Sequence, residues 1–260
     1  MTPNQEARRL EDAWRDKTPI SPLSESIGLE SSVDAYAIQS SWGRMRASDG
    51  DRVLGHKIGL TSQAMRDQLG VYEPDYGQLW ESRFYPLTDG LVTMPADIFL
   101  QPRLEGELAF LLSKPLAGGD IGREEVLAAT EAVAVSAEVI DSRITDWRIK
   151  LVDTIADNAS YGAFTLGPWD SLLAGADLRD IGMVVKRNGS TEVEAVGSDV
   201  FGDPVLSVAW LANKLNQFGV TMNAGDIVLA GSFGRSIPAS TGDEFVIDTT
   251  GQPRVTVRFG

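Results

Sequence analysis

From Arg52 to the end of the chain, the sequence consists largely of short apolar or alternating runs, and these runs constrain the fold more than any other feature. Most are separated by Gly, Asp, Asn or Pro, as expected for strands joined by turns. The dipeptide Asn188-Gly189 predicts a tight hairpin turn. The runs are RVLGHKIG, GELAFLLS, AVAVSAEVID, GAFTLG, MVVKRNG, DIVLAGS, EFVIDTT and RVTVRF. The chain is therefore predicted to be mainly β.

Two segments with helical periodicity precede this strand-like region. Residues 3–17 and 31–47 place apolar side chains at helical spacing, and Ser31 or Ser32 supplies an N-cap for the second segment. We expect both segments to be helices that form an N-terminal helical arm, residues 1–50.

Two further helices are predicted within residues 51–260. One covers residues 122–131, and the other covers residues 203–218, where Asp203 can cap the helix and Pro204 occupies its first turn. No internal repeat or break in composition marks a second domain. The predicted fold class is α+β, predominantly β, with a sheet core, peripheral helices and the helical arm.

Charge and composition restrict the chemistry. The 260 residues include 23 basic and 37 acidic side chains, and the net charge of -14 opposes binding to nucleic acid. The absence of cysteine excludes disulfides, thiolate metal ligands and a thiol nucleophile. No apolar run is long enough to span a bilayer, and the first residues are charged where a signal peptide would be apolar. We expect a cytoplasmic protein with no membrane partner, whose metal ligands, if any, are oxygen or nitrogen atoms.

Three glutamates lie in segments that are predicted to be strands. Glu105 and Glu107 are two residues apart, so in a strand they project from the same face, about 7 Å apart. Glu138 lies within an apolar run, where an unpaired charge would be costly. Three carboxylates suit a hard cation such as Mg²⁺ or Mn²⁺. The alternative is that Glu105 and Glu107 lie on a solvated strand face and Glu138 pairs with an arginine.

Lys57 stands at the centre of a short strand that glycines flank. Close to a metal and partly buried, its ammonium form would be disfavoured, which would suit a proton donor or a group that polarises a carbonyl. A surface lysine whose stem packs on the protein is the alternative. His56, the only histidine, would face the opposite side and is interpreted as structural.

A polar segment follows Glu138 closely. It comprises Asp141-Ser142-Arg143 and residues 153–160, where small and polar side chains are concentrated. Such a concentration after a strand is typical of a loop that carries a site. Caps and turns, which Asp, Asn and Ser also favour, are an equal alternative.

A series of motifs over roughly residues 30–259 resembles, in order and spacing, one known enzyme family. The motifs are KIGLTSQAM, LGVYEPDYGQL, QPRLEGELAF, AEVIDSRITDW, VDTIADNAS, AWLANKL, AGDIVLAGSF and the closing segment from Gly242-Asp243 to Arg258-Phe259. The family is the fumarylacetoacetate hydrolase superfamily, in its branch of 2-oxopent-4-enoate hydratases and 4-oxalocrotonate decarboxylases. The resemblance implies a mixed, rolled β-sheet core with surrounding helices, and a homo-oligomer.

The resemblance also implies a metal-binding catalytic domain, residues 51–260. Its divalent metal, Mg²⁺ or Mn²⁺, would be held by Glu105, Glu107 and Glu138. Lys57 corresponds to the active-site lysine of the family, and Asp75 corresponds to an acidic residue of the site loop. Substrate contacts are expected from Arg103, Asp157, Asn158, Ser160 and Ser232.

The activity implied is that of a lyase in the catabolism of aromatic compounds. A 2-oxo acid can offer its carboxylate and its 2-oxo oxygen to a divalent metal. Addition of water to 2-hydroxypenta-2,4-dienoate, the enol form of 2-oxopent-4-enoate, or to a close analogue would give a 4-hydroxy-2-oxo acid. We expect Lys57 to support proton transfer or polarisation at the enol oxygen, and Asp75 to assist proton transfer on the dienol or water.

Several rival functions stay open at this point. A 4-oxalocrotonate decarboxylase would share the glutamates and the lysine, although DSRITDW and VDTIADN look more like the hydratases. A 2-oxohept-4-enedioate hydratase would need Arg148 or Arg235 for a distal carboxylate. Carbon–carbon hydrolases of the superfamily are disfavoured because the site-loop region, residues 61–86, contains no histidine. A non-catalytic scaffold is disfavoured because every expected site position is occupied. A complex with a pathway enzyme is also possible by family resemblance.

Overall fold

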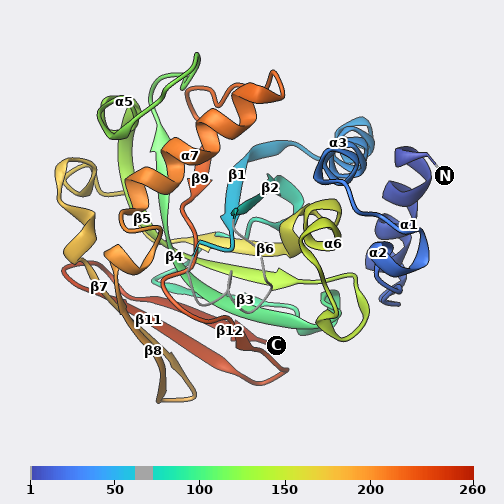
Figure 1. Ribbon diagram of the computed structural model, residues 1–260. Coiled ribbons are helices and arrows are strands. Elements are labelled where there is room, and N and C mark those ends of the chain that lie inside the picture. Colours follow the sequence, from blue (N-terminus) through green and yellow to red (C-terminus); the bar gives the residue numbers. More distant parts are fainter. Residues whose placement is uncertain (1, 62–72) are drawn as a thin grey trace.

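The computed structural model describes residues 2–61 and 73–260, which form two mixed β-sheets with helices around them (Figure 1). Within these residues the larger sheet has seven strands in the order β2-β1-β9-β4-β5-β6, with β10 paired to β4. Its strands are β1 (Val53–Gly59), β2 (Asp75–Trp80), β4 (Pro102–Leu112), β5 (Thr130–Asp141), β6 (Tyr161–Leu166), β9 (Ile227–Leu229) and β10 (Ile237–Pro238). Strands β1 and β9 are parallel, and the other pairs are antiparallel.

The smaller sheet covers part of the larger one and has the order β3-β12-β11-β7-β8. Its strands are β3 (Leu91–Met94), β7 (Gly182–Arg187), β8 (Ser190–Val196), β11 (Glu244–Thr249) and β12 (Val255–Phe259). The predicted hairpin joins β7 to β8, and both turn residues adopt a positive φ, 50° at Asn188 and 83° at Gly189. The predicted α+β class with a mixed, predominantly β core is confirmed, but the strands divide between two sheets.

The helices lie at the periphery of the sheets (Figure 1). They are α1 (Pro3–Asp16), α2 (Leu23–Ser26), α3 (Ser32–Ser48), α5 (Arg123–Ala129), α6 (Leu151–Ala156) and α7 (Pro204–Gln217). Ser31 caps α3 by accepting a hydrogen bond from Asp34 N–H, and Asp203 caps α7 through Val205 N–H. The four predicted helices are thus confirmed, whereas α6 lies in the polar segment that we predicted as a loop or turns.

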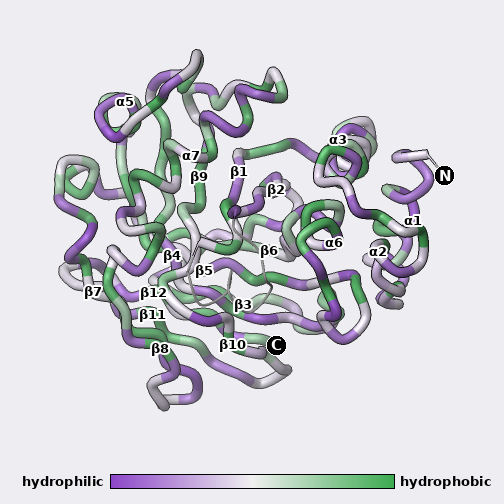
Figure 2. Tube along the Cα trace, in the orientation of Figure 1, coloured by the Kyte–Doolittle hydropathy of each residue, from purple (hydrophilic) through white to green (hydrophobic). Residues whose placement is uncertain are grey.

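The two sheets touch at β4. Gly106 permits this contact, because a Cβ there would lie 2.7 Å from Met183 Sδ and 2.9 Å from Val185 Cγ2, both on β7 of the smaller sheet. Figure 2 shows hydrophobic residues interspersed with hydrophilic ones along the strands, as expected where a sheet buries one face. Since Gly106 faces the smaller sheet, its neighbours Glu105 and Glu107 face the opposite side.

The N-terminal helices pack beside β2, an edge strand of the larger sheet. Trp14 of α1 and Trp42 of α3 contact Trp80 at the end of β2, with ring centroids 5.5 Å and 5.1 Å from it. Their apolar residues belong to the same buried core as the sheets. The division into an arm, residues 1–50, and a domain, residues 51–260, stays a prediction. Within the described part of the chain, no helix combines the length and apolar character needed to cross a membrane.

Candidate active site

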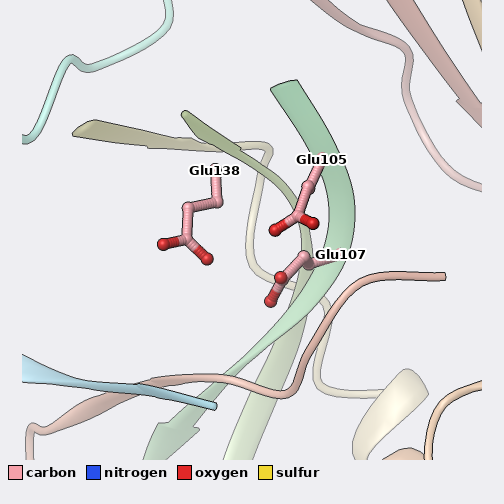
Figure 3. A group of neighbouring side chains, drawn as sticks. All are labelled: Glu105, Glu107 and Glu138. Carbon is pink, nitrogen blue, oxygen red and sulfur yellow. The ribbon is translucent and has the colours of Figure 1, made fainter. Parts of the chain in front are cut away.

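The three predicted glutamates converge because of the register between β4 and β5. Antiparallel pairing places Glu105 directly opposite Glu138, and Glu107 opposite Ser136. One carboxylate oxygen from each glutamate lies within 4.8 Å of the others (Figure 3). All three side chains are buried, with exposed fractions of 5% or less. The alternative of a solvated strand face is therefore excluded, and Glu138 pairs with a lysine, not an arginine.

Only some of the carboxylate oxygens in this cluster accept hydrogen bonds from protein donors. Glu107 Oε2 accepts a hydrogen bond of 2.9 Å from Gly231 N–H. Among the described residues, Glu107 Oε1 and both oxygens of Glu138 accept no hydrogen bond. Burial raises the pKa of Glu105 to about 7 and the pKa of Glu107 well above its usual range, and repulsion from Glu138 adds to both shifts. Buried carboxylate oxygens without donors are the ligands that a hard divalent cation requires, so the residues fit Mg²⁺ or Mn²⁺.

Lys57 occupies the middle of β1, between β2 and β9. Its Nζ atom lies 3.2 Å from Glu138 Oε1 and donates a hydrogen bond of 3.0 Å to the Ala159 carbonyl. Burial alone would lower the pKa of Lys57, but attraction from Glu138 and the neighbouring carboxylates outweighs it and raises the pKa. Without a bound cation, the ammonium form is thus favoured, the reverse of our expectation for a lysine beside a metal.

Asp75 begins β2 directly opposite Gly59 at the end of β1. Its Oδ2 accepts a hydrogen bond of 2.9 Å from Thr154 Oγ1, while Oδ1 is buried with no donor among the described residues. Gly59 makes room for this carboxylate, because a Cβ at that position would lie 2.1 Å from Asp75 Oδ1. Burial raises the pKa of Asp75. One oxygen is thus fixed, and the other is available for proton exchange.

A cavity of about 300 Å³ lies beside Lys57, Asp75 and Glu105. Glu105 lines it, whereas Glu107 and Glu138 lie fully buried, with exposed fractions of 0%. The polar lining includes Lys57, Asp75, Arg103, Glu105, Thr154, Ser160, Ser232 and Ser236. The apolar lining includes Ile58, Leu60, Ile140, Trp147 and Ile149. His56 is buried outside the cavity lining, and burial lowers its pKa to about 4, so it is neutral.

The predicted substrate-binding residues fall into two groups. Arg103, Ser160 and Ser232 line the cavity, whereas Asp157 and Asn158 do not. The side chains of the latter two are fully buried and bonded to protein groups. No pattern in the sequence singled out Trp147 or Ser236 as a site residue, and Thr154 was only one member of the polar segment. Nothing in the local pattern distinguished these residues from caps and turns.

The backbone beside Lys57 is strained. Asn158, Ala159 and Ser160 adopt the left-handed conformation in succession, with φ of 54°, 50° and 53°. For residues other than glycine, this conformation costs roughly 1–2 kcal/mol each, so neighbouring contacts must hold it. The Asn158 side chain accepts a hydrogen bond of 2.8 Å from Gln78 N–H and donates one of 3.0 Å to the Gln78 carbonyl. These contacts tie the turn to β2.

Arg143 secures the start of the same turn from the other side. Its fully buried guanidinium donates to Asp157 Oδ1 at 2.6 Å and to the carbonyls of Asp141 and Tyr161 at 2.5 Å and 2.6 Å. It also donates to the Asp157 carbonyl and lies 5.0 Å from the centroid of the Trp42 ring. The sequence left a site loop and a set of caps and turns as equal alternatives here, and the structure shows a turn whose polar groups are bonded to Arg143 and Gln78.

The fold and the site together define a class: a mixed β-sheet protein that carries three convergent, buried glutamates and a lysine beside one cavity. The family model for the fumarylacetoacetate (FAA) hydrolase C-terminal domain matches residues 62–259. The chain belongs to the fumarylacetoacetate hydrolase family, as its motifs predicted.

Individual relatives narrow this comparison. The chain is 42% identical over 255 residues to a 2-hydroxyhexa-2,4-dienoate hydratase of Comamonas testosteroni, covering 98% of this chain and 96% of the relative. It is 43% identical over 218 residues to a 2-hydroxypent-2,4-dienoate hydratase of Pseudomonas putida, covering 84% of this chain and 97% of the relative. Among solved structures, it resembles 4-oxalocrotonate decarboxylase from Pseudomonas putida G7, complexed with magnesium and adipate. The TM-score is 0.94 at 31% identity, covering 99% of this chain and 97% of the other.

Proposed function

We propose that the protein is a divalent-metal-dependent hydratase that adds water to 2-hydroxypenta-2,4-dienoate or a close analogue and yields a 4-hydroxy-2-oxo acid. Two relatives with identities of 42% and 43% are named as hydratases of 2-hydroxy-2,4-dienoates. The observation that carries the proposal is the position of Lys57 and Asp75 on one cavity beside three buried carboxylates. A dienoate hydratase needs these groups together, because it must hold an anionic substrate and move protons.

The proposed metal ligands are Glu105, Glu107 and Glu138, and the proposed ion is Mg²⁺ or Mn²⁺. Their open oxygens and their mutual distances of at most 4.8 Å support this assignment. When bound, the divalent ion would supply positive charge that stabilises negative charge on the 2-oxo oxygen of the substrate. A solved relative at 31% identity is complexed with magnesium, which supports a divalent ion.

Lys57 and Asp75 would divide the proton transfers. The reaction first moves the enol proton away and adds a proton at C5, and water then adds at C4 with a proton at C3. The Lys57 ammonium, held beside Glu138, would stabilise charge on the enol oxygen by hydrogen bonding. The free Oδ1 of Asp75 would accept a proton from the dienol or from water and return it to carbon. Thr154 keeps the other oxygen of Asp75 fixed during this exchange.

Arg103, Ser160 and Ser232 are the proposed substrate contacts on the cavity wall. Arg103 donates to Ser236 Oγ at 2.8 Å and to the Ser236 carbonyl at 3.1 Å. Among the described residues, no carboxylate pairs with it, so its charge is available to an anionic substrate. The facing apolar wall, which includes Trp147 and Ile149, would hold the hydrocarbon part of the dienoate.

A second candidate is an activity on a dicarboxylic 2-oxo acid, either hydration or decarboxylation. Arg235 lines the cavity near Arg103, although Glu192 pairs with it. Two arginines on one cavity favour a substrate with a second carboxylate. Arg148, our other expected partner for such a group, is absent from the cavity lining and pairs with Glu25.

The test is direct. Purified protein with Mg²⁺ or Mn²⁺ is given freshly generated 2-hydroxypenta-2,4-dienoate, loss of the dienol absorbance is followed, and the product is identified by mass. A gain of one water that Glu107→Ala abolishes supports the hydratase. Release of CO₂ from 2-oxohex-3-enedioate, without turnover of the dienol, would move the assignment to the decarboxylases. The absence of a reaction with either substrate would refute the proposed substrate class.

We also propose that the protein works in the cytoplasm as a homo-oligomer during the breakdown of aromatic compounds, with a possible pathway enzyme as partner. These proposals rest on family resemblance. Light scattering coupled to size-exclusion chromatography tests the oligomer, and a mass equal to the 28.1 kDa monomer would refute it.

A further inference from the structure

We propose that Asn158 is a positioning residue that holds the Ala159 carbonyl against the Lys57 ammonium. This inference rests on the proposed hydratase function, and it gives Asn158 a different role from the substrate contact predicted from the sequence. It is drawn from three observations: a strained turn, a two-point clamp on that turn, and the hydrogen bond that the turn presents to Lys57.

The strained turn needs an external restraint. Asparagine tolerates a left-handed backbone better than most residues, but alanine and serine do so rarely, and here all three follow one another. An unrestrained segment of this sequence would relax to a negative φ and move the Ala159 carbonyl. The conformation thus persists only because surrounding contacts impose it.

The clamp from Asn158 ties this turn to the strand that pairs with β1. Both polar atoms of its amide bond to the backbone of Gln78, at 2.8 Å and 3.0 Å. Gln78 pairs with His56, and the adjacent Gly77 pairs with Lys57. The turn also lies directly on Gly77, where a Cβ would be 2.4 Å from the Asn158 carbonyl oxygen. Asn158 therefore fixes the turn relative to the backbone of Lys57 itself.

The hydrogen bond at the end of this chain of contacts orients the ammonium. Lys57 Nζ donates to the Ala159 carbonyl at 3.0 Å and lies 3.2 Å from Glu138 Oε1. An ammonium has three protons; one is donated to the Ala159 carbonyl, and the ion pair with Glu138 Oε1 further restricts where the ammonium lies. A remaining proton can be donated into the cavity, which Lys57 and Ala159 both line. Loss of the carbonyl would let the ammonium rotate away from the substrate.

The chain offers a matched control in Asn188. This asparagine also has a left-handed backbone, with φ of 50°, and its side chain also makes two hydrogen bonds. Its Nδ2 donates to Asp243 Oδ1 at 2.7 Å, and its Oδ1 accepts from Glu244 N–H at 2.9 Å. It lies in the β7–β8 hairpin of the smaller sheet, and it is not part of the cavity lining. Glycine at either position keeps the backbone conformation accessible and removes only the side-chain bonds.

The experiment compares Asn158→Gly with Asn188→Gly in the metal-loaded enzyme, using 2-hydroxypenta-2,4-dienoate. We expect Asn158→Gly to lower kcat by at least about 10-fold with KM changed less than about threefold, and Asn188→Gly to change kcat less than about twofold. In a Lys57→Met background, the additional loss from Asn158→Gly should shrink to less than about twofold, because the residue acts through Lys57. If Lys57→Met has no measurable rate, ¹⁵N NMR of the Lys57 ammonium replaces this arm. Its signal should change in Asn158→Gly and not in Asn188→Gly.

Three outcomes would overturn the inference. Equal kcat values for the two glycine variants would mean that Asn158 holds the fold and nothing more. An undiminished effect of Asn158→Gly without Lys57 would mean that it acts by another route. An ammonium signal unchanged in Asn158→Gly would mean that Lys57 does not depend on the turn. By contrast, a wild-type protein that leaves the dienoate unchanged would refute the proposed function and not this inference.

Discussion

Two buried charged clusters contact the turn at residues 157–160, and they differ in how their polar atoms are satisfied. In the first, Arg143 and Asp157 are both fully buried, and the guanidinium donates to the carboxylate and to three backbone carbonyls. In the second, Glu105, Glu107 and Glu138 converge, Lys57 pairs with Glu138, and several of the glutamate oxygens have no donor among the described residues.

The difference separates a cluster with a structural role from the proposed metal site. A buried ion pair whose hydrogen bonds are complete needs no further partner, and removing one member destabilises the fold. A buried cluster with open acceptors is unfavourable until a ligand completes it. Both clusters contain buried carboxylates, so burial alone does not identify the site. Open oxygens among three carboxylates that converge within 4.8 Å do.

The largest effect on stability is expected from the first cluster. Arg143→Met leaves Asp157 buried without its partner and leaves three carbonyls without a donor, so we expect the free energy of unfolding to fall by about 5 kcal/mol. Urea unfolding followed by circular dichroism measures this. Arg143→Lys keeps the charge but not the planar fork, and should lose less. A change under about 1 kcal/mol in Arg143→Met would contradict the assignment of a structural role.

A substitution in the glutamate cluster should lower activity strongly without lowering the stability of the metal-free protein. Glu107→Gln keeps the shape and the acceptor for Gly231 N–H but removes a buried negative charge. We expect dienoate hydration to fall about 10³-fold, which corresponds to about 4 kcal/mol. The metal-free protein should unfold at the same or a higher urea concentration. Loss of both activity and metal-free stability would show that this glutamate also serves the fold.

Metal removal should make stability depend on pH. Burial raises the pKa of Glu105 from 4.5 to about 7, so between these values the folded protein retains a proton that the unfolded chain has released. Stability of the metal-free protein should therefore be greatest at the acidic end and fall as pH rises to 7, by on the order of 3 kcal/mol. Urea unfolding with a chelator at about pH 5, near the acidic end of this range, and at about pH 8, above it, tests the sign. The variant Glu105→Gln should make the dependence less steep without abolishing it, because Glu107, Glu138 and Asp75 still have raised pKa values, and excess Mg²⁺ should also weaken it. An equally steep fall in that variant would exclude Glu105 as a source.

The smallest effect on the free energy of unfolding is expected from an exposed ion pair. Arg258 Nε lies 2.7 Å from Glu244 Oε2 on the smaller sheet, with side chains 53% and 40% exposed. Water screens such a pair, so Arg258→Gln should change the free energy of unfolding by about 0.5 kcal/mol or less. The same urea titration measures it. A larger loss would show that charge pairing on this sheet is stronger than its exposure indicates.

The sequence predicted what depends on local periodicity. Alternation along one strand was enough to place Glu105 and Glu107 on the same face, and capping residues were enough to place the helices. The pairing of strands could not be predicted, because periodicity indicates which face a residue occupies but not which strand lies beside it. The two-sheet arrangement and the contact at Gly106 were missed for that reason. The raised pKa of Lys57 was missed because it depends on four carboxylates from three strands.

Asp157 and Asn158 show a further limit. Their residue types suited a substrate contact, yet in the structure the Asp157 side chain is hydrogen-bonded to Arg143 and the Asn158 side chain is hydrogen-bonded to Gln78. An aspartate or asparagine that binds protein backbone has the same sequence signature as one that binds a ligand. Only the partners distinguish the two cases, and those partners are far away in the sequence.

The register between β4 and β5 also determines where the length of this chain can change. Deleting Gly106 would make Glu105 and Glu107 adjacent and place them on opposite faces of β4, so the three glutamates would no longer meet. The connection between the strands, residues 113–129, carries no such constraint, and residues 117–120 in it are exposed. The same constraint on length therefore applies to natural and to engineered variants. A peptide inserted at Gly118-Gly119 should be tolerated without loss of activity, whereas removal of Gly106 should abolish activity.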